Sequence, residues 1–185
     1  MIEAIQDLDT GALLYIQDFL RTPFLTPIMV FSSKLGNAGF IWIFTGLLLL
    51  VSKKTRRGGF DLLICLIAAY IVNDLVIKPL VARPRPYDTI EALQILVKPL
   101  SSYSLPSGHT NFSFAAATAL TLAYGKRGAL AYIPAVLIAV SRCYVGVHYP
   151  TDVLLGMLVG TMVALTVYLL LQKYVKTYLF RKNKL

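Results

Sequence analysis

Residues 141–152 read SRCYVGVHYPTD and join two long apolar runs, 128–147 and 151–172. A turn at Gly146 and Pro150 would bring the basic start and the acidic end of this stretch together. Charged side chains cost several kcal/mol near the centre of a bilayer, so a polar cluster between two such runs indicates a functional site.

Six apolar runs occur along the chain, at 23–33, 38–52, 60–77, 110–124, 128–147 and 151–172. The chain is 57% hydrophobic and only 15% charged, whereas soluble domains have ~25% charged residues. Most of its surface must therefore face lipid. We predict an all-α, polytopic membrane protein with six transmembrane helices, built as a single domain over residues 1–185. Several runs are shorter than the roughly 20 residues that cross a bilayer upright, so their ends are uncertain.

The N-terminal segment is amphipathic and has two interpretations. Apolar residues recur there at mostly helical spacing with acids between them, namely Ile2, Ile5, Leu8, Leu13, Ile16 and Phe19. This pattern is typical of an interfacial helix that leads into the first span. Alternatively, the segment belongs to an extended and bent first span that begins near Gly11.

Clusters of basic residues indicate the orientation, because cytoplasmic loops carry an excess of lysine and arginine. These clusters lie at 53–57, 126–127 and 181–184. With six spans all three fall on one face, which we predict to be cytoplasmic in the plasma membrane. The three polar stretches of the chain then meet on the extracytoplasmic face. The net charge of +9 is accordingly assigned to topology and anionic lipid and not to nucleic acid.

A second polar stretch, PSGH at 106–109, precedes the apolar run 110–124. Proline is favoured in the first turn of a helix, and the free N–H groups of that turn form an anion site. Gly108 would let a phosphate oxygen approach the backbone, Ser107 could add a hydroxyl donor, and His109 would project beside the anion. Taken alone the motif is weak, because His109 could instead hydrogen-bond a loop carbonyl.

The acid Asp152 follows His148 by four residues and also has two interpretations. Its carboxylate could accept a proton from one imidazole nitrogen and leave the other nitrogen as a nucleophile. Alternatively, Asp152 is an acid that the helix dipole favours at a helix N-terminus.

The remaining polar stretch is KPLVARPRP, residues 78–86, followed by a loop to residue 105. Arg85 could grip phosphate bidentately and Lys78 could add a point charge, whereas a snorkelling headgroup anchor is the ordinary explanation. Spacing alone does not decide which of Arg83 and Arg85 turns inward. The loop 86–105 is predicted to be a short amphipathic helix at the mouth of the site, with a plain connector as the alternative.

Together the three stretches suit a dianionic phosphate that passes through a charged transition state. One histidine would attack phosphorus and the other would protonate the leaving oxygen. A metal site on two histidines and an aspartate is the rival interpretation. Lys78, Arg85 and Arg142 would repel a cation there, so we expect neither a metal nor another cofactor.

In these motifs the chain resembles the type 2 phosphatidic acid phosphatase superfamily of integral-membrane lipid phosphatases. The family pattern is Lys, six residues, Arg-Pro; then Pro-Ser-Gly-His; then Ser-Arg, five residues, His, three residues, Asp. Residues 78–152 match all three parts in order. Arg85 takes the arginine position of the first part, and Arg83 is out of register.

The resemblance implies a role for each matched residue. His148 would be the nucleophile that forms a phosphohistidine, and Asp152 would orient it. His109 would be the general acid and then the base that activates water. The phosphate would be held by Lys78, Arg85, Ser107, Gly108 and Arg142. The family needs no metal.

The resemblance leaves the lipid open. Small members act on undecaprenyl diphosphate, phosphatidylglycerophosphate or phosphatidic acid. A site on the outer face favours conversion of undecaprenyl diphosphate to undecaprenyl phosphate after cell-wall polymer transfer, with the other two lipids as alternatives. A non-catalytic protein that binds or transports lipid phosphates would use the same cations, but it would not need a nucleophile, an acid and an orienting group. The oligomeric state is open, because Gly156 and Gly160 permit close packing within or between chains.

Overall fold

The computed structural model describes the backbone of residues 2–182 and the side chains of residues 3–174; Lys184 of the third basic cluster lies outside the described residues. The described chain contains helices and no β-strand, which confirms the all-α class. The α-helices are α1 (Ile2–Tyr15), α2 (Leu25–Leu35), α3 (Phe40–Val51), α4 (Arg56–Tyr70), α5 (Lys78–Val81), α6 (Pro86–Thr89), α7 (Gly108–Tyr124), α8 (Lys126–Ala129), α9 (Tyr132–Tyr144) and α10 (Pro150–Lys182). Three further helical turns are η1 (Ile16–Leu20), η2 (Asn37–Gly39) and η3 (Ile71–Ile77).

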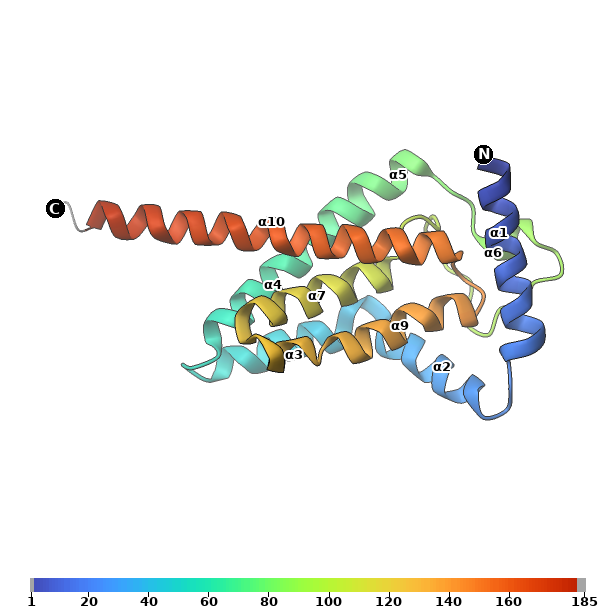
Figure 1. Ribbon diagram of the computed structural model, residues 1–185, viewed down its shortest axis with the longest axis horizontal. Helices are drawn as coiled ribbons and strands as arrows, with labels where there is room; N and C mark the ends of the chain where they lie inside the picture. Colours follow the sequence, from blue (N-terminus) through green and yellow to red (C-terminus); the bar gives the residue numbers. More distant parts are fainter. Residues whose placement is uncertain (1, 183–185) are drawn as a thin grey trace.

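Helix α7 lies at the centre of the bundle and packs against α4, α9 and α10 (Figure 1). Small residues allow this close approach, because Ala115, Ala116 and Ala117 are fully buried in the core. A Cβ atom at Gly156 of α10 would lie 2.7 Å from the backbone oxygen of Ser107, and one at Gly160 would clash with the backbone of α7. These two glycines therefore pack α10 against α7 within the chain.

The helix lengths do not confirm the count of six spans. Two helical segments are long and apolar enough to cross a membrane: Arg56–Thr89, which is interrupted at residues 82–85, and Pro150–Tyr174. Helices α2 and α3 qualify only as a pair bent by 52°, because 11 and 12 residues rise only about 17 and 18 Å. The runs 23–33 and 38–52, which were expected to be separate spans, are thus the two halves of one bent pair.

The bend between α2 and α3 arises from the backbone at Gly36–Gly39. Ala38 and Gly39 adopt left-handed conformations, with φ of 49° and 65°, which interrupt a right-handed helix. A Cβ atom at Gly39 would lie 3.0 Å from the Phe112 ring of α7. The bend therefore brings η2 close to the N-terminal half of α7.

The N-terminal helix α1 lies across one end of the bundle (Figure 1). The non-helical residues at Arg21 and Thr22 separate η1 from the chain that leads into α2, so α1 does not continue into α2. Leu13 anchors α1, because it is 1% exposed and packs in a cluster with Leu93, Ala139 and Tyr149. In the loop 86–105 only α6 is helical, so most of that loop is a connector.

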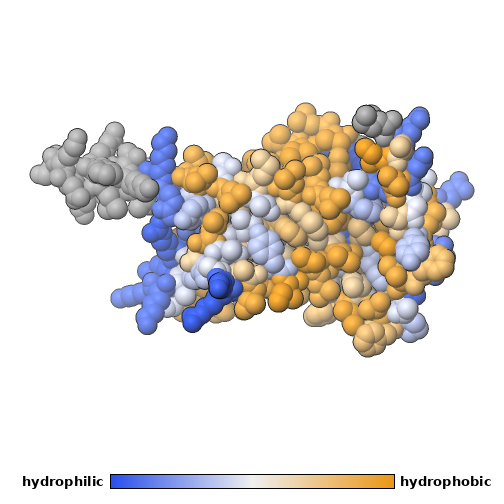
Figure 2. Space-filling view, in the orientation of Figure 1, coloured by the Kyte–Doolittle hydropathy of each residue, from blue (hydrophilic) through white to orange (hydrophobic). Residues whose placement is uncertain are grey.

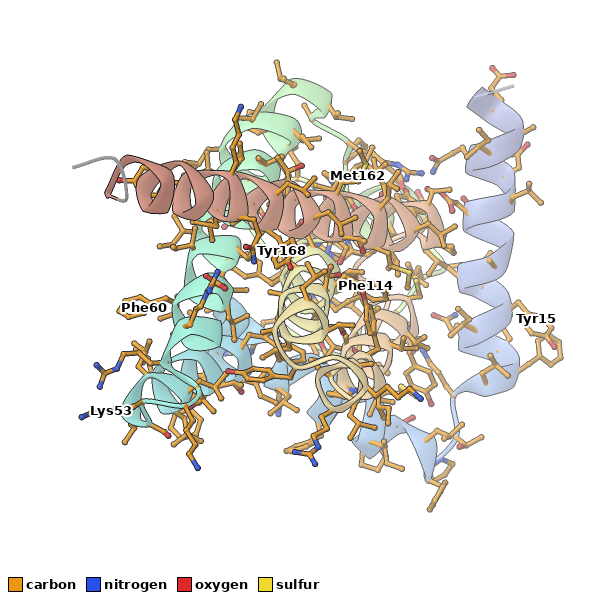
Figure 3. All side chains as sticks on the ribbon, turned by 60° about the vertical axis from the view of Figure 1, so that its left-hand side comes forward. Tyr15, Lys53, Phe60, Phe114, Met162 and Tyr168 are labelled. Atoms are coloured by element: carbon orange, nitrogen blue, oxygen red, sulfur yellow. The ribbon has the colours of Figure 1, made fainter. Side chains whose placement is uncertain are left out.

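The surface is apolar around the middle of the bundle and hydrophilic at both ends (Figure 2). The exposed basic residues at 53–57 and 126–127 lie at the end opposite α1, where Figure 3 labels Lys53. Apolar side chains of the helices are exposed, such as Phe60 on α4 and Leu154 on α10, 52% and 62% respectively. Such a band is expected of a helix bundle embedded in lipid.

Candidate active site

The three polar stretches converge on one cavity of about 290 Å³ near the end of the bundle where α1 lies. Its lining includes five of the predicted site residues, namely Lys78, Arg85, Gly108, His109 and His148. The rest of the lining comes from the bend at Gly36–Gly39, from the end of α4, from η3, from α7 and from the loop after α6. The bend of the α2–α3 pair thus forms one wall of the site.

His148 lies in the turn between α9 and α10 and is 1% exposed. Its Nε2 is 3.0 Å from Nη1 of Arg85, and its Nδ1 is 3.3 Å from Oδ2 of Asp152. Because an arginine can only donate, Nε2 must be the unprotonated nitrogen and Nδ1 must carry the proton toward Asp152. Burial, together with the nearby cations Arg85, Arg142 and Lys78, lowers the pKa of His148 well below its ordinary value. The ring is therefore neutral, with a lone pair on Nε2, as a nucleophile requires.

Asp152 is fully buried at the start of α10, and both of its oxygens are occupied. Oδ2 accepts hydrogen bonds from the Ser104 hydroxyl and from the backbone N–H of Tyr149, the latter at 2.9 Å. Oδ1 accepts from Nη1 of Arg83 at 2.7 Å. These contacts fix the carboxylate on the side of His148 that faces away from Arg85.

Arg85 and Arg83 point to different places. Arg85 is 3% exposed, and backbone carbonyls hold its guanidinium: Ser102 at 2.7 Å, Val147 at 2.8 Å and Tyr103 at 3.1 Å. It lines the cavity, whereas Arg83 is turned toward α1 and α10. The structure therefore places Arg85 beside His148, which spacing alone could not decide.

His109 stands in the first turn of α7 on the other side of the cavity. Its Nε2 is 2.9 Å from the side-chain oxygen of Asn37. Asn37 belongs to η2, so the bend between α2 and α3 supplies this partner. An amide oxygen accepts from Nε2–H and thereby orients the ring. Nothing in the three motifs pointed to Asn37.

Asp74 also lines the cavity and was missed by the sequence analysis. It lies in the π-helix η3, and its Oδ1 is 2.6 Å from Nζ of Lys78. A Cβ atom at Gly108 would lie 3.3 Å from the same Nζ, so the Lys78 ammonium reaches the backbone at the start of α7. Asp74 could have been noticed as an acid inside the apolar run 60–77, because charges in such runs are rarely accidental.

Two predicted phosphate ligands do not line this cavity. Ser107 is fully buried, and its hydroxyl accepts a hydrogen bond from Thr110 at 3.0 Å. Arg142 is 2% exposed, donates to the Ser33 hydroxyl and has a buried Nε without a partner. It lines a neighbouring cavity of about 640 Å³ with Lys34 and Lys98. In this structure, therefore, Arg142 faces the adjoining space.

The histidines do not converge as metal ligands would. His148 contacts Asp152, whereas His109 contacts Asn37. Within residues 3–174 no three His, Cys, Asp or Glu side chains are grouped so that they could hold a metal ion. The charged groups at the cavity are instead two cations and one acid, Lys78, Arg85 and Asp74. This arrangement suits an anion.

Comparison with known proteins agrees with this geometry. Residues 58–176 match the family model of the PAP2 superfamily. The chain is 38% identical over 141 residues to an undecaprenyl-diphosphatase of Sulfolobus acidocaldarius, covering 76% of this chain and 68% of that protein. These matches confirm the resemblance that the three motifs carry.

Two crystal structures share the fold. One is a transmembrane PAP2-type phosphatidylglycerolphosphate phosphatase from Bacillus subtilis, with a TM-score of 0.73 and 28% identity, covering 92% of this chain and 87% of that one. The other is LpxE of Aquifex aeolicus, with a TM-score of 0.74 and 27% identity, covering 85% of this chain and 93% of that one.

Proposed function

Because the chain belongs to the PAP2 superfamily, we propose that it hydrolyses undecaprenyl diphosphate to undecaprenyl phosphate through a phosphohistidine on His148. The observation that supports this most directly is the chain of side-chain contacts from Arg85 to His148 to Asp152. It leaves a neutral Nε2 on His148 that faces a cationic cavity. The 38% identity to an undecaprenyl-diphosphatase supports this choice of lipid.

The first chemical step transfers the terminal phosphoryl group to His148. The lone pair of Nε2 attacks the terminal phosphorus while the bond from phosphorus to the bridging oxygen breaks. His109, protonated once the dianion is bound beside it, gives its proton to the leaving lipid phosphate. Arg85 exchanges its hydrogen bond to Nε2 for the phosphoryl oxygens and, with Lys78, stabilises their charge.

The second step returns the enzyme to its starting state. Neutral His109 takes a proton from a water molecule whose oxygen attacks the phosphorus. The phosphorus–nitrogen bond breaks, its electron pair returns to Nε2 of His148, and inorganic phosphate leaves. Throughout both steps Asp152 accepts the hydrogen bond from Nδ1–H and stabilises the positive charge that forms on the ring.

We further propose that the bundle crosses the plasma membrane with its cavity on the extracytoplasmic side. The α2–α3 pair would cross as one broken span, followed by α4–α5, α7, α8–α9 and α10, with α1 along the outer surface. The earlier count of six spans becomes five, and the orientation stays the same because the basic residues at 53–57 and 126–127 lie at the end opposite α1.

Cysteine labelling on intact cells should report this orientation. The natural thiols, Cys65 and Cys143, are both buried and give little background. A cysteine at exposed Ser101, beside the cavity, should react with an impermeant thiol reagent on intact cells. A cysteine at exposed Lys54 should react only after lysis. The reverse pattern would invert the topology and place the substrate in the inner leaflet.

Phosphate release from a panel of lipids tests the choice of substrate. Purified protein in detergent with EDTA should hydrolyse undecaprenyl diphosphate with a kcat/KM at least about tenfold above those for phosphatidylglycerophosphate and phosphatidic acid. The similarity to the B. subtilis phosphatidylglycerolphosphate phosphatase makes phosphatidylglycerophosphate the second candidate. A higher kcat/KM for that lipid would replace our choice of substrate and leave the mechanism unchanged.

A further inference from the structure

Arg83 lies outside the family pattern, yet it connects the N-terminal helix to the catalytic centre. Its Nη1 is 2.7 Å from Oδ1 of Asp152, and its Nη2 is 2.7 Å from Oδ2 of Asp9 in α1. The same guanidinium also donates to Thr151 at 2.8 Å and to Gln6 at 2.6 Å. One side chain thus joins α1, the segment after α5 and the start of α10.

Asp9 is built into this contact as firmly as Arg83. It is 2% exposed, and its Oδ1 accepts the backbone N–H of Thr151 at 3.0 Å, while Oδ2 accepts the Thr151 hydroxyl. Taking a carboxylate out of water costs several kcal/mol unless it is paired and hydrogen-bonded. The other described acids of α1, Glu3 and Asp7, are exposed.

The aromatic ring of Tyr149 also holds the Arg83 guanidinium. Its Cζ lies 3.9 Å from the centre of the Tyr149 ring, a distance at which a cation is attracted to an aromatic face. The Tyr149 hydroxyl in turn lies 2.6 Å from the Thr89 hydroxyl. The planar guanidinium of Arg83, held by two carboxylates and an aromatic ring, has little freedom to move. A lysine ammonium group on its flexible stem could not make the same set of contacts.

We propose that Asp9 and Arg83 are positioning residues for the proposed phosphatase reaction: Asp9 holds Arg83, Arg83 holds Asp152, and Asp152 holds His148 in its reactive tautomer. The N-terminal helix is then a working part of the active site. This inference rests on the proposed function, because it assigns Asp152 and His148 their roles in phosphoryl transfer. Neither Asp9 nor Arg83 lines the catalytic cavity, so we place neither in contact with the reacting phosphate.

The test compares Asp9→Asn with Asp7→Asn, the same change at an exposed acid two residues away. Asp9→Asn should lower kcat about tenfold and Arg83→Ala about 100-fold, both with KM little changed, in the range seen when a residue that orients a functional side chain is lost. Asp7→Asn should behave as wild type. The double variant Asp9→Asn/Arg83→Ala should be no slower than Arg83→Ala, because Asp9 acts through Arg83.

Vanadate separates positioning from a merely structural role. As a mimic of five-coordinate phosphorus it should bind Asp9→Asn about tenfold more weakly, in step with the loss of kcat. A structural defect would instead reduce the amount of folded protein and leave the vanadate inhibition constant unchanged. Arg83→Lys should recover part of the kcat lost in Arg83→Ala, since it restores the charge without the fork.

The outcomes distinguish the two proposals. If wild type releases phosphate from none of the lipid phosphates, the proposed function is wrong, and vanadate binding still reports on the site. If wild type is active and Asp9→Asn matches Asp7→Asn in kcat and vanadate inhibition, the positioning role is refuted. Equal losses of kcat in Asp9→Asn and Asp7→Asn would also refute the positioning role, because the loss would then follow from any change of charge on α1.

Discussion

Replacing His148 with alanine should lower kcat by at least about 10⁴-fold, the scale of loss when a covalent nucleophile is removed. The ring supplies a lone pair that is held between a fixed cation and a fixed carboxylate, Arg85 on one side and Asp152 on the other. Without it, water would have to attack phosphorus directly, with no group in line to carry the phosphoryl group. The change is measured as phosphate release from undecaprenyl diphosphate in detergent.

A labelled intermediate makes this result specific to the nucleophile. Phosphohistidine survives alkali and is lost in acid, so wild type quenched in alkali after mixing with terminally labelled substrate should retain label on the protein. His148→Ala should retain none, while its thermal unfolding midpoint and elution volume match those of wild type. Label retained on His148→Ala would assign the attack to His109 and reverse the roles of the two histidines.

The contact between His148 and Asp152 was accessible from the sequence because it is local. Asp152 is the fourth residue after His148, and the proline at the start of α10 fixes where the helix begins, so the carboxylate returns to the ring. The position of PSGH at the start of α7 was accessible for the same reason, since it stands directly before an apolar run. What these residues do in the reaction stays a prediction.

The number of spans could not be predicted from the sequence, because it depends on a backbone conformation. Ala38 at φ 49° is in a region that a non-glycine residue rarely occupies, and no propensity of alanine indicates it. The resulting bend turns two apolar runs into one bent pair and also delivers Asn37 to His109. A single turn of chain thus accounts both for the unconfirmed count of six spans and for a missed residue of the site.

Contacts between distant segments of the chain could not be predicted from the sequence either. Arg83 and Arg85 are two residues apart with the same chemistry, and distant partners separate their surroundings: Asp9 of α1 and Asp152 of α10 pair with Arg83 and not with Arg85. Arg142 was assigned to the phosphate by its motif, yet Ser33 on α2 holds it toward the neighbouring cavity. In both cases the deciding partners lie far away in the chain.

Replacing His109 with asparagine should lower kcat by about 10²- to 10⁴-fold, the usual contribution of a general acid–base group. Asparagine keeps a polar group near Asn37 but cannot exchange a proton. The two chemical steps should not suffer equally. With undecaprenyl diphosphate the leaving group is a phosphate, which departs as a stable anion, so the first step needs little help from an acid. The second step needs a base to deprotonate water and should become the slow one.

His109→Asn should therefore accumulate the alkali-stable phosphoenzyme and show a burst of undecaprenyl phosphate, close to one per active site, followed by slow turnover. The same variant acting on phosphatidic acid provides the matched comparison, because there the leaving group is an alkoxide that needs the proton. Formation of the phosphoenzyme should then itself be slow, and no label should accumulate. Accumulation with both lipids would show that His109 serves only as the base, since loss of the acid would then leave the first step intact. Accumulation with neither would mean that another group activates water, and the division of roles between the two histidines would have to be abandoned.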